Sequence, residues 1–174
     1  MTKNLKYRKC DLNDLEMLTA ISRETFVKAY EMDNDPDDFK TYVDFAFDLN
    51  QIKIELENPN SEFYFIYWEK LVVGYLKLNE KDAQRESYGS DSLELARIYI
   101  LKNFQGQDIG RESLFKIIEL AKNKSKSWIW LSVWQLNPNA VRFYERHGFK
   151  KFDTHAFIIG NDRQIDWLMR LNLV

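Results

Sequence analysis

Apolar residues recur along this chain with two periods, one typical of helices and one typical of strands. After a short strand in LKYRKC, Asp11 is suited to cap a helix, and five apolar positions then follow at roughly helical spacing: Leu15, Leu18, Ile21, Phe26 and Tyr30. The acidic stretch EMDNDPDD interrupts this pattern. Two shorter helices are predicted next, over residues 39–47 and 51–57, the second stopped by NPNS.

The rest of the chain alternates between strand and helix patterns. EFYFIYW and LVVGYLKLN, joined by the turn EK, predict a hairpin in which Gly74 marks a bulge or a close backbone approach. The strand SLELARIYI, a helix over residues 109–122, the strand WIWLSVW, a helix over residues 138–147 and two last strands around FDTHAFIIG and QIDWLMRL follow. The order β-α-α-α-β-β-β-α-β-α-β-β predicts an α/β fold around one mixed sheet, as a single domain over residues 1–174.

Charge and composition narrow the possible partners. With 25 Lys and Arg residues against 27 Asp and Glu, the net charge is −2 and no basic stripe stands out, which disfavours nucleic acid as a ligand. Cys10 has no partner for an internal disulfide, and the first residues lack the apolar core of a signal peptide, so a cytoplasmic protein is expected. No apolar run reaches the roughly 20 residues that cross a bilayer. Five tryptophans and the aromatic C-terminal strands are compatible with a homodimer.

The loop NFQGQDIGRES, residues 103–113, joins a predicted strand to a predicted helix. Such a helix start offers unpaired N–H groups and a positive dipole end to an anion, and two glycines let the backbone approach a ligand. Asp108 brings a negative charge to this place. A P-loop does not fit, because Gly110 is followed by Arg111 and Glu112, and the three spaced glycines of a dinucleotide fingerprint are missing. A purely structural turn is the alternative.

A second informative stretch is LSVWQLNPNAVRFYERHGF. Asn137 followed by Pro138 is a strong helix start, and Gly148 ends the helix after scarcely three turns. Asn137 and Tyr144 are seven residues apart, so they face the same way and can share a ligand. The alternative is a cap residue and a tyrosine anchored in the core.

Taken together, the two stretches resemble the GNAT superfamily of acyl-CoA-dependent N-acetyltransferases. The loop motif of that family, Q/R-x-x-G-x-G/A, is matched by Gln105, Ile109 and Gly110, with Asp108 in place of the first glycine. The second family motif, V-x-x-x-N-x-x-A-x-x-x-Y-x-x-x-G-F, is matched in full by Val133, Asn137, Ala140, Tyr144, Gly148 and Phe149. The resemblance covers most of the chain.

The resemblance implies a mostly antiparallel sheet of about seven strands, whose strands LARIYI and WLSVW splay apart to hold acetyl-CoA, with no metal. The pantetheine arm is expected along the backbone of Ile98, Tyr99 and Ile100, with Asn137 beside it. The diphosphate is expected on the helix start formed by Gln105, Gly106, Gln107, Asp108, Ile109, Gly110 and Arg111. Tyr144 is expected to protonate the departing thiolate, and the Ile98 amide to donate to the developing oxyanion. Asp108 is expected to cap the helix and to weaken diphosphate binding.

An aliphatic ammonium has a pKa of about 10.4, so a group must take its proton before it can attack. Glu94 is the candidate, directly or through water, with an exposed strand glutamate as the alternative; Ala96 stands where relatives often carry another acid. Several segments look like the PaiA-like branch, enzymes that acetylate polyamines such as spermidine and spermine. The acidic run Glu31, Asp33, Asp35, Asp37 and Asp38 would suit a polycation, or simply face water. Other amine acceptors, and a regulatory protein that keeps the fold, stay open as alternatives.

Overall fold

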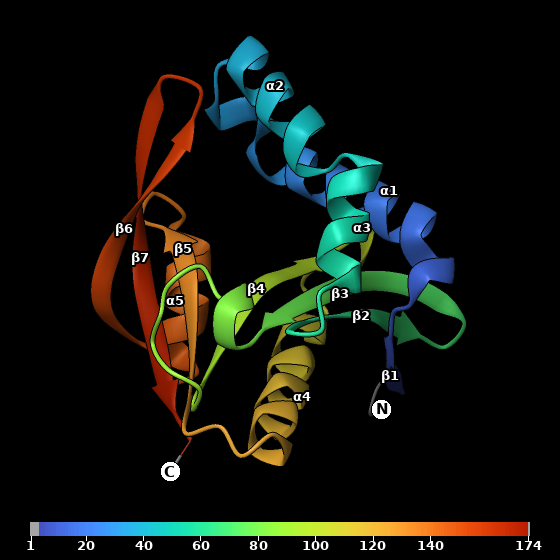
Figure 1. The fold of residues 1–174 in the computed structure, drawn as a ribbon, viewed down its shortest axis with the longest axis vertical. Coiled ribbons are helices and arrows are strands. Elements are labelled where there is room, and N and C mark those ends of the chain that lie inside the picture. The colour runs from blue at the N-terminus through green and yellow to red at the C-terminus, as the bar shows by residue number, and fades with distance from the viewer. Residues whose placement is uncertain (1–3, 174) are drawn as a thin grey trace.

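The computed structural model describes residues 4–173, which form one seven-stranded sheet flanked by helices (Figure 1). The strands are β1 (Leu5–Lys9), β2 (Ser61–Trp68), β3 (Leu71–Asn79), β4 (Ser92–Ile100), β5 (Trp128–Trp134), β6 (Lys150–Ile159) and β7 (Asp162–Asn172). The α-helices are α1 (Leu15–Tyr30), α2 (Pro36–Ala46), α3 (Leu49–Glu57), α4 (Ile109–Asn123) and α5 (Pro138–Arg146). None of these helices is long and apolar enough to cross a membrane.

The sheet order β1-β2-β3-β4-β5-β7-β6 makes every neighbouring pair antiparallel except β4 with β5. The predicted α/β architecture and order of elements are therefore confirmed. Two helices begin earlier than predicted. Helix α2 starts at Pro36 because Asp35 accepts hydrogen bonds from the amides of the first turn, and α3 starts at Leu49 because Asp48 caps it in the same way.

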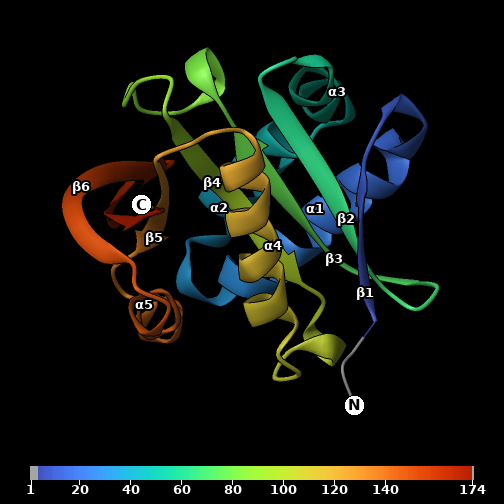
Figure 2. The ribbon, with the colours of Figure 1, turned by 90° about the horizontal axis from the view of Figure 1, so that it is seen from below.

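Alternation along the strands gives the sheet two buried faces. On β3, Leu76 and Leu78 belong to an apolar cluster with α4, whereas Tyr75 belongs to a second cluster with α1, α2 and α3. Figure 2 shows α4 crossing the sheet on one side, with α1 on the other. Because both faces are covered, a ligand can reach the middle of the sheet only where two strands separate.

That separation occurs between β4 and β5. The two strands pair only over residues 92–94 and 128–130, so they diverge towards their C-terminal ends. A register irregularity in the β3–β4 pair, at Lys77 and Leu78, falls just beyond this point. Gly74 makes the close approach that the sequence predicts, because a Cβ there would lie 2.3 Å from the Tyr99 carbonyl oxygen.

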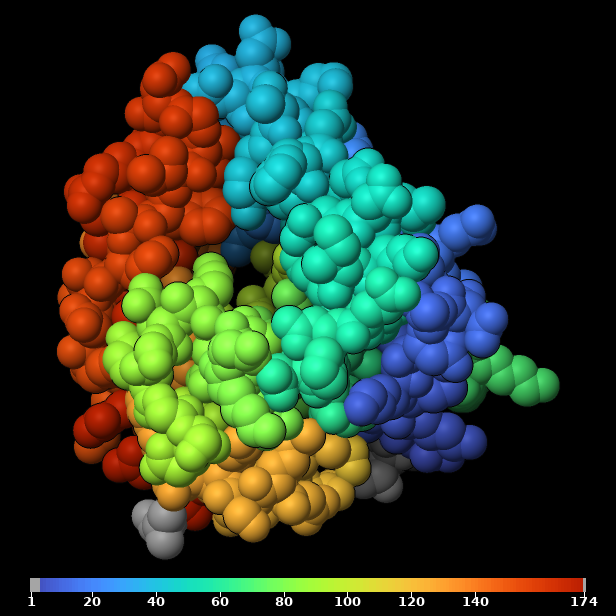
Figure 3. All heavy atoms as spheres, viewed as in Figure 1, coloured from blue at the N-terminus to red at the C-terminus, as the bar shows by residue number. Residues whose placement is uncertain are grey.

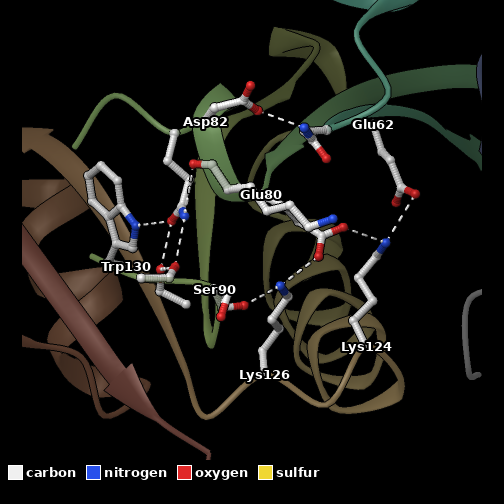
Figure 4. Close-up of polar contacts among 12 residues, drawn as sticks. Glu62, Glu80, Asp82, Ser90, Lys124, Lys126 and Trp130 are labelled. Carbon is white, nitrogen blue, oxygen red and sulfur yellow. Dashed lines mark hydrogen bonds and ion pairs between the residues drawn. The ribbon is translucent and has the colours of Figure 1, made fainter. Parts of the chain in front are cut away.

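Strands β4 and β5 together form a V, and polar contacts hold its closed end, where the two strands still pair (Figure 4). Gln84, in the loop between β3 and β4, accepts hydrogen bonds from Ser92 on β4 (2.9 Å) and from the Trp130 indole on β5 (2.7 Å). Beyond the end of α4, Lys124 donates to Glu80 (2.9 Å), which also pairs with Lys126 (2.6 Å). These contacts fix the loop of residues 80–91 against both strands, so the divergence of β4 and β5 begins from an anchored point.

Candidate active site

A cavity of about 1260 Å³ passes through the V between β4 and β5. One part is lined by the start of α4 and by α5, and the other by α1, by Glu55 near the C-terminal end of α3 and by the β6–β7 pair. Figure 3 shows an opening on the second side, between α2 and α3, the β6–β7 pair and the loop of residues 80–91. We call the first part the cofactor half and the second part the acceptor half.

The exposed edge of β4 forms one wall of the cofactor half. Ile98, Tyr99 and Ile100 all line the cavity, at positions where β5 has already diverged from β4. The backbone groups that these residues direct towards β5 therefore take no part in strand pairing. One of them, the Ile100 carbonyl, accepts a hydrogen bond from the Gln105 side chain (3.0 Å). A ligand with amide groups can bond along this edge as an added strand does.

The loop before α4 forms the end of the cofactor half. Six of the seven residues predicted here line the cavity: Gln105, Gly106, Asp108, Ile109, Gly110 and Arg111. The seventh, Gln107, lies in the same loop, and its side chain donates to the Asn103 carbonyl (3.3 Å). The first N–H groups of α4 have no acceptor within the helix, which leaves them free to bind an anion.

The role predicted for Asp108 as a helix cap is wrong. Asp108 adopts the left-handed conformation (φ 62°, ψ 4°), and its side chain makes no capping hydrogen bond. Its carboxylate instead lies 3.6 Å from the Arg111 guanidinium and is largely exposed. The backbone accounts for the difference, because a left-handed residue directs its side chain away from the N–H groups that a cap in the extended conformation reaches. Glycine adopts this conformation without strain, and aspartate is among the residues that tolerate it.

Helix α5 brings the second motif to the cavity. Asn137 lines the cavity and also caps the helix, since its side chain accepts from the Ala140 amide (3.2 Å). Tyr144 lines the cavity two turns later, with its ring against Phe143 and Phe149. Burial raises the pKa of the Tyr144 phenol, and the nearby Tyr30 adds to the rise. Tyr144 is therefore protonated at neutral pH, as a proton donor must be.

Glu94 is neither an exposed strand residue nor part of the cavity wall. Its side chain is fully buried and accepts hydrogen bonds from Asn79 (3.1 Å), from the Arg85 amide (3.0 Å) and from the Arg85 guanidinium (2.8 Å). Arg85 itself lines the cavity. Glu94 thus positions a cavity cation, and both of its oxygens are already engaged.

The acceptor half contains a buried ionic cluster that the sequence analysis did not identify. Lys77 on β3 and Arg97 on β4 are directly opposite each other in the antiparallel pair, and Glu55 on α3 lies between them. The Glu55 carboxylate accepts from Lys77 (2.9 Å) and from Arg97 (3.0 and 3.4 Å). Although burial opposes it, Arg97 and Lys77 lower the pKa of Glu55, so this acid is ionised at neutral pH.

Asp166 on β7 forms the other wall of the acceptor half. Its carboxylate is mostly buried and accepts a hydrogen bond from Ser132 on β5 (2.6 Å), but within residues 4–173 no Lys or Arg pairs with it. Two tyrosines lie between the walls. The pKa of Tyr30 is raised, first by burial and further by Asp166. Burial likewise raises the pKa of Tyr42, on which charges from both walls act: Arg97, Arg85, Glu55 and Asp166.

The acidic run after α1 does not line the cavity. Asp35 accepts from the backbone amides of Asp37 and Asp38, and Asp38 accepts from the Asn161 amide at the β6–β7 turn (3.1 Å). Part of this charge therefore stabilises a helix start and a contact between distant segments. Cavity residues that the sequence did not indicate as site residues include Tyr30, Tyr42, Glu55, Lys77, Arg97 and Asp166. The signal available for Lys77 and Arg97 was a charge at an inward position of an otherwise apolar strand.

Comparisons with known proteins agree with this arrangement. The Acetyltransferase (GNAT) family matches residues 15–149. An uncharacterized N-acetyltransferase from the pepI 3' region of Lactobacillus delbrueckii subsp. lactis is 38% identical over 165 residues, covering 92% of this chain and 93% of its own. A probable spermine N(1)-acetyltransferase of Bacillus subtilis subsp. natto is 28% identical over 107 residues, covering 59% of this chain and 70% of its own.

Among solved structures, the PaiA N-acetyltransferase of Thermoplasma acidophilum in complex with coenzyme A superposes with a TM-score of 0.76. It is 21% identical, and the match covers 97% of this chain and 99% of that one. At this identity the similarity concerns the fold alone.

Proposed function

Because this chain belongs to the GNAT family of acetyltransferases, we propose that it transfers the acetyl group of acetyl-CoA to a primary amine by direct attack on the thioester. The observation that carries the proposal is the cavity through the V, which joins the free edge of β4 and the start of α4 to Tyr144 and then to an acceptor half with its own opening. Two substrates can therefore meet between β4 and β5 from opposite sides of the sheet. We place the reaction in the cytoplasm, as the single buried Cys10 suggests.

The cofactor half provides separate contacts for the two parts of acetyl-CoA. The pantetheine arm lies along Ile98, Tyr99 and Ile100, beside Asn137, and the diphosphate lies on the N–H groups at the start of α4. Arg111, which lines the cavity next to Asp108, adds a positive charge there. Binding of this kind depends on backbone groups more than on side chains.

Tyr144 acts as the general acid. The amine nitrogen attacks the thioester carbonyl, the new C–N bond forms as the oxyanion develops near the Ile98 amide, and collapse breaks the C–S bond. The electron pair leaves with sulfur, and the thiolate takes the proton of the Tyr144 phenol. The nitrogen loses its second proton as the amide forms, and that proton restores the Tyr144 phenol. The burial that keeps this phenol protonated supports the assignment.

The ammonium must first lose a proton, and two carboxylates are candidates to accept it. Glu94, predicted from the sequence, would act through water, because both of its oxygens are bonded to Asn79 and Arg85. Asp166 lies on the cavity wall and is bonded to a neutral hydroxyl, so it can meet an ammonium directly. We assign the proton to Asp166 and retain Glu94 as the alternative in the test.

The names of relatives make polyamines the first acceptors to test. The Bacillus relative is named as a probable spermine acetyltransferase, and a Thermoplasma acidophilum relative, 23% identical over 155 residues, is named as a spermidine N(1)-acetyltransferase. A regulatory protein that only retains the fold is the second candidate function. Tyr144 disfavours it, because a binding protein has no need of a buried phenol in the cavity.

The test is a turnover screen that follows release of the CoA thiol and identifies the acetylated product by mass spectrometry. Spermidine, spermine, simple monoamines and peptides serve as acceptors, and Tyr144→Phe serves as the inactive reference. Amine-dependent thiol release that this variant loses is the expected result. Binding of acetyl-CoA without turnover on any amine would overturn the proposal and favour the regulatory role.

A further inference from the structure

We propose that Arg97 and Lys77 form an anion subsite in the acceptor half, and that the acceptor is an amine which also carries a carboxylate or a similar anionic group. The inference rests on the proposed acetyl transfer and narrows its acceptor to a class different from the polyamines. Its basis is the distribution of charge on the two walls of the acceptor half.

The first wall carries two cations against one anion. Glu55 is shared by Lys77 and Arg97, so the cluster has one positive charge more than its own members can balance. Both cations are mostly buried, with 9% and 19% of their side chains exposed. A buried charge is unfavourable unless it is paired, so an anionic ligand group would complete the cluster. Burial and the neighbouring Arg97 lower the pKa of Lys77 although Glu55 opposes the shift, as expected where two cations share one carboxylate.

The second wall carries the opposite charge. Asp166 bonds to Ser132, a neutral partner, and its negative charge is open to an ammonium group. Tyr30 lines the cavity together with Asp166 and Tyr144. Beyond the effect of burial, Asp166 contributes to the raised pKa of Tyr30, and Tyr30 contributes to the raised pKa of Tyr144, so Tyr30 connects this wall to the reaction centre. The amine of the acceptor is therefore placed at Asp166, near Tyr144, and its anionic end at Arg97 and Lys77.

The remaining charges of the acceptor half do not change this balance. Arg85 lines the cavity, but its charge is compensated by Glu94 directly behind it. Outside the cavity, Asp38 and the rest of the acidic run cannot offset the Arg97 wall. A polyamine bound with one end at Asp166 would bring a second ammonium towards Arg97 and Lys77, where like charges repel. An amino acid or a short peptide with a free carboxylate matches both walls.

A matched set of acceptors tests the inference. Butylamine, 1,4-diaminobutane and 4-aminobutyrate carry the same reactive amine on four carbons and end in a neutral, a cationic and an anionic group. Homologues with two to six carbons cover the unknown spacing of the two walls. We expect kcat/KM to be at least about tenfold higher for the best anionic acceptor than for the neutral one of equal length, with the diamine lowest.

Variants then locate the effect. Arg97→Gln leaves Glu55 paired with Lys77 alone and should abolish the preference for the anionic end through a higher KM, whereas Arg97→Lys keeps the charge and should retain most of the preference. Arg23→Gln removes an arginine that is paired with Asp44 outside the cavity, so it controls for net charge. An unchanged KM for acetyl-CoA and an unchanged circular dichroism spectrum show that each variant is folded.

Each outcome bears on one of the two proposals. If the neutral or the cationic acceptor is acetylated at least as well as the anionic acceptor of equal length, at every length from two to six carbons, the anion subsite is wrong and the acetyl transfer stands. If no amine is acetylated, calorimetric titration of the CoA-bound protein decides: tighter binding of 4-aminobutyrate that Arg97→Gln removes supports the subsite without the reaction. Equal binding of the three compounds would overturn the subsite as well.

Discussion

The two halves of the cavity are built by different means. The cofactor half is made mainly of backbone, from the free edge of β4 and the first N–H groups of α4, with Asn137 and Tyr144 two turns apart on a single helix. The acceptor half is made of side chains from α1, α2, α3, β3, β4 and β7, so residues more than a hundred positions apart face each other across it. Its character depends on which charges meet there.

This difference predicts how each half responds to substitution. Backbone donors survive a change of side chain, so most single replacements in the cofactor half should alter binding only moderately. In the acceptor half a single charge decides what is bound, because the groups are buried and each has few partners. Tyr144 relates to both halves, since it belongs to the second motif on α5 and lies near Tyr30 of the acceptor half.

The largest effect is expected from Tyr144→Phe. Loss of the phenolic proton should lower kcat by about a hundredfold or more, with little change in the Kd of acetyl-CoA, because the ring and its packing remain. Steady-state kinetics measure kcat, and calorimetric titration measures the Kd of acetyl-CoA. Tyr64→Phe is the control, since its hydroxyl bonds Glu62 outside the cavity.

The pH dependence of the reaction rate gives a second test of Tyr144. Because burial raises the Tyr144 pKa above the ordinary value of 10.0, the phenol keeps its proton throughout the neutral and mildly alkaline range. The rate of wild type should therefore rise with pH as the amine is deprotonated, without falling below pH 10. If kcat of Tyr144→Phe stays within threefold of wild type, Tyr144 is not the general acid.

The next largest effect is expected from Asp166, the carboxylate of the acceptor half. Asp166→Asn keeps an acceptor for the Ser132 hydroxyl but removes the charge, so kcat/KM should fall by roughly tenfold to a hundredfold near neutral pH. The loss should shrink as pH approaches the pKa of the amine, because less of the substrate then needs a proton acceptor. A uniform loss at every pH would mean that Asp166 only positions the substrate.

Glu94→Gln should behave differently. Its carboxylate is buried and holds Arg85, so the variant should lose about 2 kcal/mol in the free energy of unfolding, while kcat stays within about threefold of wild type. Chemical denaturation measures the first quantity, with Glu86→Gln, a partly exposed partner of His155, as the control. If kcat falls a hundredfold in the folded variant, Glu94 is the proton acceptor and Asp166 is not.

The contrast between the halves also explains what the sequence could reveal. Asn137, Tyr144 and the α4 loop are indicated by local signals, namely a cap, a helical spacing of seven and a strand-to-helix turn, and Asn137, Tyr144 and six of the seven loop residues line the cavity. Glu94 could not be placed in the same way, because its environment depends on Arg85 in a separate loop. Likewise Lys77 and Arg97 are placed opposite each other by the register of β3 with β4, which no local pattern indicates.

The smallest effect concerns Asp108, the residue at which the α4 loop departs from the family motif. Its backbone N–H is unaffected by the side chain, so the anion site remains, and since the side chain makes no cap, nothing is lost from α4 when it is replaced. Its charge opposes a phosphate: at ~6 Å and an effective dielectric of ~20 the repulsion is at most about 3 kcal/mol, and exposure and the Arg111 contact reduce it. Asp108→Gly should therefore tighten acetyl-CoA binding by about threefold to tenfold at low salt.

A second variant separates charge from backbone at this position. Asp108→Asn removes the charge and also tolerates the left-handed conformation, whereas glycine in addition adopts it without strain. If repulsion is the cause, both variants should tighten binding equally in calorimetric titration, and the gain should fade as salt is raised, because screening weakens the repulsion in wild type. A gain confined to glycine and insensitive to salt would show that backbone strain, not charge, limits the fit of the diphosphate. Weaker binding by both variants would mean that the Asp108–Arg111 pair itself holds the loop in its binding conformation.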